Sequence, residues 1–447
     1  MRNSVLHRSV DWFRKLLSAV ILVIISLIST VASMELILRF TSYDSLRNQY
    51  IGLLPQSYLC NDPVMEFDNC TNRSPLTHEG NGFVYETWSN ELGCFDKPYK
   101  GEDNYILLLG DSFTWGFTSF DEKWGSIIEK MLGMRVLKCG VTGYGTIQEL
   151  AKLEKVSSKV SYRPRLITLG YYIGNDLEDD LLSPRLTLIN GYLVDTGYVD
   201  RSTGKIVKYD KEELKTTADD LLRYGLINPP ENRKVILKFK RWLSLNSVIY
   251  NLLRRTGSLR DVAARIGIVE PAPPDTQEVL APLPFIVPQD GSAWLDQAWH
   301  DHLMSIRLIK NAADRIGAEL LVVLIPMKMQ IYDFLKAAYK TESDREIDWN
   351  FPNEKLKSFL EGHGIRYLDL TPIFREYADN KPRRILDSKE DLYWSEDSHW
   401  NTRGNLLAGL SVSKYILEHG LAGTEGSQKR IDTVKAELMV AKERRSQ

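Results

Sequence analysis

Five short runs rich in apolar residues lie along the chain, with helically spaced segments between them. The runs are Tyr105 to Leu109, Arg135 to Cys139, Arg165 to Tyr171, Glu319 to Ile325 and Arg366 to Leu370. The helically spaced segments are Glu122 to Leu132, Ile147 to Val160, His302 to Ile316, Glu354 to Glu361 and Arg403 to His419. Apolar strands that alternate with amphipathic helices predict an α/β fold with a parallel five-stranded sheet covered on both faces.

A longer uncharged run, Leu16 to Met34, stands apart from this pattern. At ~1.5 Å per residue it can cross a bilayer core, whereas the apolar part of a signal peptide spans only ~7–15 residues. A cleaved signal peptide ending near Ser33 is the alternative, and the length of the run favours an uncleaved anchor. Basic residues precede the run, so we expect residues 1–15 in the cytoplasm, a transmembrane helix over 16–38, and the rest outside. This topology predicts a single-pass protein of the inner (plasma) membrane whose main domain is periplasmic or at the cell surface.

The chain beyond the anchor divides into a lead-in and one large domain. Residues 39–103 show no strong period and are interpreted as a lead-in that packs on the main domain. The main domain is predicted to span residues 104–447, and residues 181–298 interrupt its alternation of strands and helices. We interpret this interruption as an inserted subdomain.

The insertion has three recognisable parts. Asn190-Gly191 is a strong hairpin signal, Lys238 to Arg255 is a basic helical stretch, and Glu270 to Pro288 is a proline-rich linker. After the last predicted core helix, the charged tail from Thr424 to Gln447 is interpreted as a solvated helix.

Composition limits the partners of the protein. The 43% hydrophobic content is that of a globular protein, and a net charge of -2 gives no basic field for nucleic acid. Outside the cytoplasm, Cys60 and Cys70 could close a small loop, while Cys94 and Cys139 could pair or remain thiols. The absence of a CxxC pair argues against a zinc ribbon or a thioredoxin-type site.

Polar segments follow the first three strands. They read GDSFTWG (110–116), GVTGYGT (140–146) and GYYIGND (170–176), and parallel strands bring such segments to one edge of a sheet. Ser112 offers a hydroxyl, Gly143 a backbone N–H that a ligand can approach closely, and Asn175 a side-chain amide. With the N–H of Ser112, these groups could donate three hydrogen bonds to a developing oxyanion.

A serine nucleophile needs a base within hydrogen-bond reach. Among the seven histidines, His399 alone falls in the loop beyond the fifth strand, within YWSEDSHWNTRG. Asp397 or Glu396 could orient its imidazole, and Asp397 is favoured because residues two apart in an extended chain lie on one side. His300 and His302 are expected to be solvated. The acidic residues after Asn175 are interpreted as first-turn helix residues rather than as a cation site.

The ordered set of Ser112, Gly143, Asn175 and His399, each in its motif, resembles the SGNH, or GDSL, hydrolase family. The resemblance covers residues 105–176 and 303–419 and implies a flavodoxin-like α/β/α sandwich. It also implies ester hydrolysis or acyl transfer without a metal or cofactor, Ser112 as nucleophile, and an oxyanion hole of Ser112, Gly143 and Asn175. The usual family pattern places the aspartate where Glu396 stands here. Asp397 instead gives the Asp-x-His spacing of a cell-envelope branch that acetylates or deacetylates polysaccharides such as alginate.

These observations predict a membrane-anchored serine esterase that removes O-acyl groups, foremost O-acetyl groups, from an envelope or exported polysaccharide. An O-acetyltransferase with the same residues, Ser112, Asp397 and His399, is one alternative. A glycan-binding or scaffold module with a silent site is the other. The oligomeric state and the identity of the polymer are not predicted.

Overall fold

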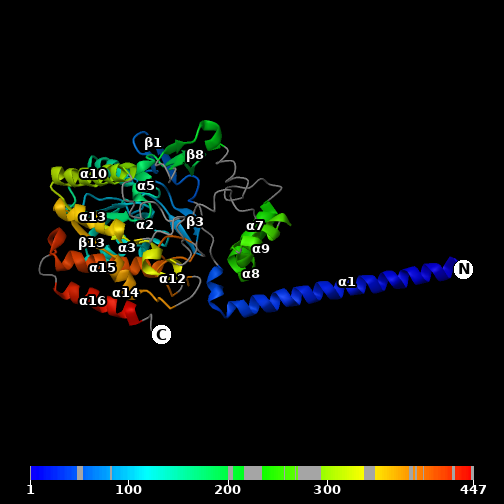
Figure 1. Cartoon of the computed structure of the whole chain (residues 1–447). Helices are drawn as coiled ribbons and strands as arrows, with labels where there is room; N and C mark the ends of the chain where they lie inside the picture. Colours follow the sequence, from blue (N-terminus) through cyan, green and yellow to red (C-terminus); the bar gives the residue numbers. More distant parts are fainter. Residues whose placement is uncertain are drawn as a thin grey trace. The chain divides into compact units, whose positions relative to one another are not determined.

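The computed structural model describes residues 2–47, 54–80, 83–199, 205–215, 234–255, 257–266, 268–269, 293–336, 348–381, 386–387, 390–395, 397–424 and 428–443. The chain forms two compact units: one comprises Met1–Asn48 and Lys238–Pro271, the other Gln49–Leu237 and Ala272–Gln447. The larger unit contains the central sheet (Figure 1). The proline-rich linker lies outside the described residues.

The central sheet has five strands in the order β13-β12-β7-β5-β6, and all of them pair in parallel. Numbered along the chain, this is the flavodoxin-like order 2-1-3-4-5. The prediction of an α/β sandwich is therefore confirmed. The strands are β5 (Tyr105–Gly110), β6 (Arg135–Lys138), β7 (Leu166–Tyr172), β12 (Glu319–Ile325) and β13 (Arg366–Asp369).

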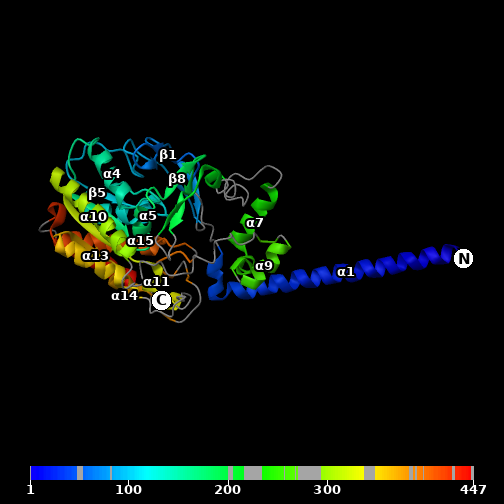
Figure 2. The ribbon, with the colours of Figure 1, turned by 45° about the horizontal axis from the view of Figure 1, so that its top comes forward.

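Helices cover both faces of this sheet. Along β5, Ile106 and Leu108 join one core and Leu107 and Leu109 the other, because successive strand side chains point to opposite faces. Figure 1 shows α10 and α15 on opposite sides of the sheet, and Figure 2 shows α4 beside α10. One face packs against α3 (Trp124–Leu132), α14 (Thr371–Tyr377) and α15 (Thr402–Glu418), the other against α4 (Thr146–Ser157), α10 (Ala293–Ile316) and α13 (Phe351–Gly362).

The register of the sheet places the polar segments together. Gly110 lies beside Gly170, and Leu108 lies beside Lys138. The segments that follow β5, β6 and β7 therefore begin at one edge, as the sequence predicted.

The lead-in contains two short antiparallel hairpins that the sequence did not predict. They are β1 (Leu59–Asp62) with β2 (Glu66–Asn69), and β3 (Leu76–Gly80) with β4 (Phe83–Thr87). Two disulfides are formed: Cys60–Cys70, here called the lead-in disulfide, and Cys94–Cys139, here called the β6 disulfide.

The insertion begins with two further hairpins. Asn190 and Gly191 have φ of 53° and 83° at the turn between β8 and β9, which is the turn that this dipeptide favours. The strands are β8 (Leu186–Ile189), β9 (Tyr192–Asp195), β10 (Gly197–Val199) and β11 (Ile206–Lys208). Three helices follow: α7 (Lys234–Asn246), α8 (Val248–Arg255) and α9 (Gly257–Arg265).

The smaller unit joins most of these three helices to the N-terminal helix α1 (Arg2–Arg39) and to η1 (Ser42–Leu46). Among the described residues, one helical segment, Arg14–Arg39, is long and apolar enough to cross a membrane, and none of its most apolar window is buried.

The remaining elements of the larger unit are short, apart from the C-terminal helix α16. We expected the tail to be a solvated helix. Val434 of α16 is fully buried, so one side of this helix packs against the protein. α10 begins at Ala293, earlier than predicted, because its first turns bury Leu295 and Trp299. The elements are α2 (Ser112–Trp115), η2 (Phe120–Glu122), α5 (Asp176–Leu181), α11 (Lys328–Ile331), α12 (Asp333–Lys336), η5 (Leu421–Gly423) and α16 (Gln428–Glu443).

Candidate active site

Ser112 lies just beyond β5, in the first turn of α2. Asp111 caps this turn, since its carboxylate accepts a hydrogen bond from the Phe113 N–H at 2.8 Å. Gly110 has φ +147°, and a Cβ there would lie 2.7 Å from the Gly170 carbonyl oxygen. The strand can therefore turn at this point only on a glycine, which fixes the serine at the edge of the sheet.

The hydroxyl of Ser112 meets the imidazole of His399. The Nε2 atom of His399 lies 2.7 Å from Ser112 Oγ, and its Nδ1 atom lies 2.5 Å from Asp397 Oδ1. The same oxygen accepts a hydrogen bond from the His399 backbone N–H at 3.1 Å, which suits the two-residue spacing. Residues from the first and last thirds of the chain thus form one hydrogen-bonded series. Glu396, the alternative carboxylate, lies outside the described residues.

The His399 ring is held between aromatic and acidic groups. Its centroid lies 4.4 Å from the Phe117 ring and 4.9 Å from the Phe113 ring, and its side chain is 16% exposed. Burial lowers the pKa of His399, but the charges of Asp397 and Asp111 and the hydrogen bond to Asp397 outweigh it, so the pKa lies above its ordinary value. Burial also raises the pKa of Asp111, to about 6.

Gly143 lies in the loop after β6, next to the turn that carries Ser112. The loop is tied to that turn because the Val141 N–H donates a hydrogen bond to the Gly110 carbonyl at 3.0 Å. Gly143 has φ +81°, a left-handed conformation, and a Cβ there would lie 2.3 Å from a methyl carbon of Leu186 on β8. The backbone conformation requires a glycine here, and the insertion approaches it closely through the end of the Leu186 side chain.

Asn175 lies immediately before α5, and the carboxylate of Asp179 orients its side-chain amide. Its Nδ2 atom donates a hydrogen bond to Asp179 Oδ2 at 2.8 Å, and Arg185 Nη1 donates one to Asp179 Oδ1 at 2.6 Å. Asn175 Oδ1 is buried and has no hydrogen-bond partner among the described residues. Burial raises the pKa of Asp179 to about 7, although Arg185 lowers it.

Buried carboxyl groups lie behind these loops. Burial, followed by the neighbouring acidic groups, raises the pKa of Glu149 and of Asp176 well above the ordinary values. Asp176 nevertheless accepts a hydrogen bond from the Tyr172 N–H at 2.9 Å, so it braces the start of α5. In the part of the chain that the structure describes, no group of three or more His, Cys, Asp or Glu side chains could hold a metal ion.

His302 differs from our expectation of a solvated side chain. It is 2% exposed, and its ring lies between Asp180 Oδ2, 2.7 Å from Nδ1, and Tyr171 OH, 2.6 Å from Nε2. Neither partner is near it in the sequence, so only the tertiary contact reveals its role. These bonds join α10 to β7 and α5, and so brace the helix that follows Asn175.

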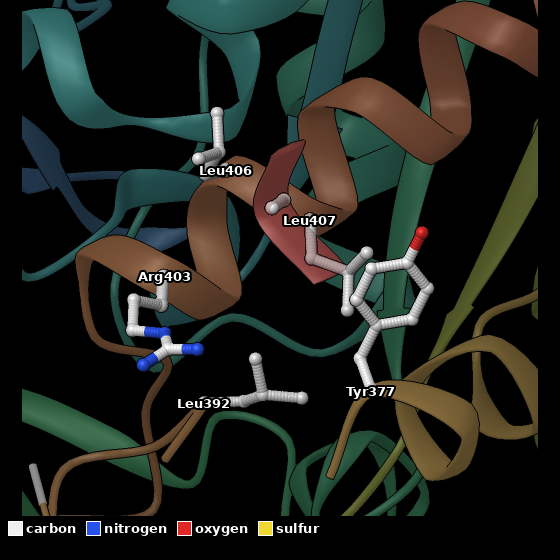
Figure 3. Close-up of a pocket in the computed structure, with 6 residues that line it drawn as sticks. Tyr377, Leu392, Arg403, Leu406 and Leu407 are labelled. Carbon is white, nitrogen blue, oxygen red and sulfur yellow. The ribbon is translucent and has the colours of Figure 1, made fainter. Parts of the chain in front are cut away.

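A separate cavity of about 180 Å³ lies between α14, α15 and α16 (Figure 3). It contains none of the predicted site residues. Its lining is mainly apolar and consists of Tyr377, Leu392, Arg403, Leu406, Leu407 and Ala441.

The arrangement at the sheet edge suits nucleophilic chemistry. A hydroxyl hydrogen-bonded to an imidazole that is itself held by a carboxylate is the geometry in which a serine loses its proton as it attacks. Gly143 and Asn175 follow β6 and β7, the two strands that flank β5 in the sheet.

Comparisons with known proteins agree with the motifs. Residues 290–440, less than half of the chain, match the family described as the SGNH hydrolase-like domain of the acetyltransferase AlgX. This range includes Asp397 and His399, whereas Ser112, Gly143 and Asn175 precede it. No curated protein sequence matches the chain significantly.

Three of the solved structures that resemble the chain are esterases or lipolytic proteins by description. An aryl esterase of M. Smegmatis in an inhibitor-bound form has a TM-score of 0.33 at 8% identity, covering 70% of this chain and 99% of that one. A putative lipolytic protein of the G-D-S-L family from Desulfitobacterium hafniense has a TM-score of 0.31 at 12% identity, covering 70% and 98%. A carbohydrate acetylesterase family member from Sinorhizobium meliloti has a TM-score of 0.29 at 11% identity, also covering 70% and 98%. The family match over residues 290–440 and the ordered motifs agree that the chain is similar to the SGNH hydrolase-like domain.

Proposed function

We propose that this protein is a membrane-anchored serine esterase that removes O-acetyl groups from an envelope or exported polysaccharide. The observation that carries the proposal is the hydrogen-bonded series from Ser112 through His399 to Asp397. The N-terminal helix supports the location, because a helix of this length and apolarity can hold the domain beside surface polymers.

In the proposed reaction, Ser112 Oγ attacks the acyl carbonyl carbon while His399 Nε2 takes the hydroxyl proton. Asp397 stabilises the imidazolium that forms and keeps Nε2 directed at the serine. The Ser112 and Gly143 N–H groups and the Asn175 amide donate hydrogen bonds to the oxyanion. His399 then returns the proton to the leaving sugar oxygen, and water attacks the acyl-enzyme to release acetate and free the serine.

Substitution of the nucleophile tests this proposal. The full chain in detergent should release p-nitrophenol from p-nitrophenyl acetate, and Ser112→Ala should abolish that release. Ser126→Ala is the matched control, since this serine lies on α3 and its hydroxyl bonds the Phe120 carbonyl. Undiminished turnover in the Ser112 variant would refute the assignment.

A second function, O-acetyl transfer to a polymer, is favoured by the description of the matched family as an acetyltransferase. It uses the same acyl-enzyme, which a sugar hydroxyl rather than water resolves. Acetylated acceptor sugar among the products, rather than free acetate alone, would identify the transferase. A folded chain that still binds glycan but whose Ser112 is not labelled by a fluorophosphonate probe would instead favour a silent binding module.

A further inference from the structure

The helices α7, α8 and α9 are strongly basic. Their sequences are KVILKFKRWLSLN, VIYNLLRR and GSLRDVAAR, which contain eight lysines and arginines and one aspartate. The whole chain, by contrast, carries a net charge of -2. Positive charge is therefore concentrated in these helices.

Large apolar side chains are exposed on the same helices. Phe239 and Trp242 of α7 are 58% and 55% exposed, and their rings stack with a centroid separation of 6.0 Å. Leu259 and Val262 of α9 and the following Ile266 are also more than half exposed. Their spacing of three and four residues places them on one helix face. Grouped exposed apolar side chains mark a surface that binds another apolar phase.

Polar bonds fix this helical group to one end of α1. Glu35 of α1 accepts hydrogen bonds from the backbone N–H groups of Val248 and Ile249 at 2.9 and 3.1 Å, and from Ser247 Oγ at 2.9 Å. A carboxylate at this position stabilises the start of α8. Arg39 Nη2 donates a hydrogen bond to the Asn246 carbonyl at 2.7 Å.

These contacts bear on where the helices lie in a membrane. Glu35 and Arg39 are at the C-terminal end of the segment Arg14–Arg39, where a spanning helix leaves the hydrocarbon core. Helices fixed at this point are within reach of the lipid headgroups. Tryptophan and phenylalanine at that depth, with lysine and arginine beside them, are the side chains of an interfacial helix.

We propose that α7 to α9 bind the outer surface of the membrane, with Trp242, Phe239 and Val262 in the headgroup region and the basic residues against anionic lipids. The proposal rests on the membrane anchoring proposed above. A lipid surface is the occupant that fits both the excess of positive charge and the attachment to α1.

Site-directed labelling of the full chain in vesicles tests the proposal. All four cysteines are in disulfides, so an introduced cysteine is the one thiol available to an environment-sensitive NBD label. The labelled variants are Trp242→Cys and Val262→Cys on the surface helices and Leu22→Cys in α1. Leu308→Cys on α10, which is 51% exposed in the larger unit, is the matched control. The vesicles contain equal parts of phosphatidylcholine and phosphatidylglycerol, with or without lipids brominated in their acyl chains.

We expect brominated lipid to quench labels at residues 242 and 262, with blue-shifted emission, and to leave the label at 308 unchanged. Quenching should weaken in vesicles of phosphatidylcholine alone, and unchanged quenching there would overturn the role of anionic lipid. If residue 22 is quenched while residues 242 and 262 behave like 308, the surface proposal fails and the anchor stands. Labels at 242 and 262 that are shielded from aqueous iodide but not quenched by lipid would place a protein on this face and overturn the proposal. An unquenched label at 22 would overturn the anchoring and the surface proposal together, while esterase assays of the same samples report on Ser112 independently.

Discussion

Gly143 gives the sharpest test of the proposed oxyanion hole. Its φ of +81° is a conformation that an alanine adopts only at a cost of ~1–2 kcal/mol. To relieve this strain, the Gly143→Ala peptide is expected to rotate, which would turn its N–H away from the oxyanion. Loss of one such donor reduces turnover by ~10²–10³, equivalent to ~2.7–4 kcal/mol.

The substitution also brings a new Cβ within 2.3 Å of Leu186 Cδ1. This contact is with the end of a flexible side chain, which can rotate away, so the backbone strain should dominate. The double variant Gly143→Ala/Leu186→Ala removes the overlap and keeps the strain. It should therefore recover little of the lost activity.

Gly101→Ala is the matched control. Gly101 has φ +78°, and nothing lies within 4 Å of the position of a Cβ. The Gly101→Ala variant should carry the same backbone strain, which should lower its thermal midpoint slightly. It should keep the full turnover of p-nitrophenyl acetate. A Gly143→Ala protein whose kcat/KM stays within about 3-fold of wild type, under ~1 kcal/mol, would refute a catalytic N–H at this position.

Three further predictions concern the base, the orientation of the amide and the disulfides. Because the pKa of His399 is raised and the neutral imidazole is the base, kcat/KM should rise with pH through a pKa above the ordinary value. Asp397→Asn should move this rise to lower pH and reduce kcat by roughly 10⁴-fold, and an unmoved pH profile would exclude Asp397 as the partner. Asp179→Asn should lower kcat with little change in KM, because its carboxylate orients Asn175; a change in KM alone would contradict this. Replacing both cysteines of the β6 disulfide by serine should lower the free energy of unfolding by about 4 kcal/mol, and the same change in the lead-in disulfide should lower it by about 3 kcal/mol. The reason is that the first disulfide closes a separation of 45 residues and the second a separation of 10. A lower thermal midpoint for the variant without the lead-in disulfide than for the variant without the β6 disulfide would refute the loop-length argument.

The sequence predicts the central fold because the strands of a sheet covered on both faces are largely apolar, as in YILLLG and ELLVVLI. The helices on each face keep a helical apolar spacing, so their type was also predictable. The lead-in hairpins were missed because their strands are short and carry polar residues, as in LCND and EFDN. Such strands give neither a continuous apolar run nor a clean alternation.

At the site, the sequence could identify residues that follow strands but not the contacts that orient them. The meeting of Ser112 with His399 could be proposed because both follow strands of one sheet. Asp179 looked like a first-turn helix residue, and only the structure shows it holding the Asn175 amide. Leu186 approaches Gly143 from an insertion whose placement no local pattern encodes.

Glu149 provides a stability test of the buried acidic groups that does not depend on activity. Both of its carboxylate oxygens are buried without a hydrogen-bond partner among the described residues, and burial raises its pKa well above the ordinary value. An acid whose pKa is raised on folding binds its proton more tightly in the folded state. Its contribution to stability is therefore present below the unfolded pKa of ~4.3 and is lost as pH rises towards the folded pKa, by up to ~1.4 kcal/mol per pH unit.

Glu149→Gln cannot lose a proton, so it should be spared this loss. The thermal midpoint of the variant relative to wild type should rise between pH 4.5 and 8, whereas Glu154→Gln, an exposed residue of the same helix, should show no such trend. If the thermal midpoints of wild type and Glu149→Gln change in parallel with pH, the carboxyl group of Glu149 is solvated or paired in the folded protein. The raised pKa inferred for the neighbouring Asp176 would then lose one of its causes, because that shift comes in part from the charge on Glu149.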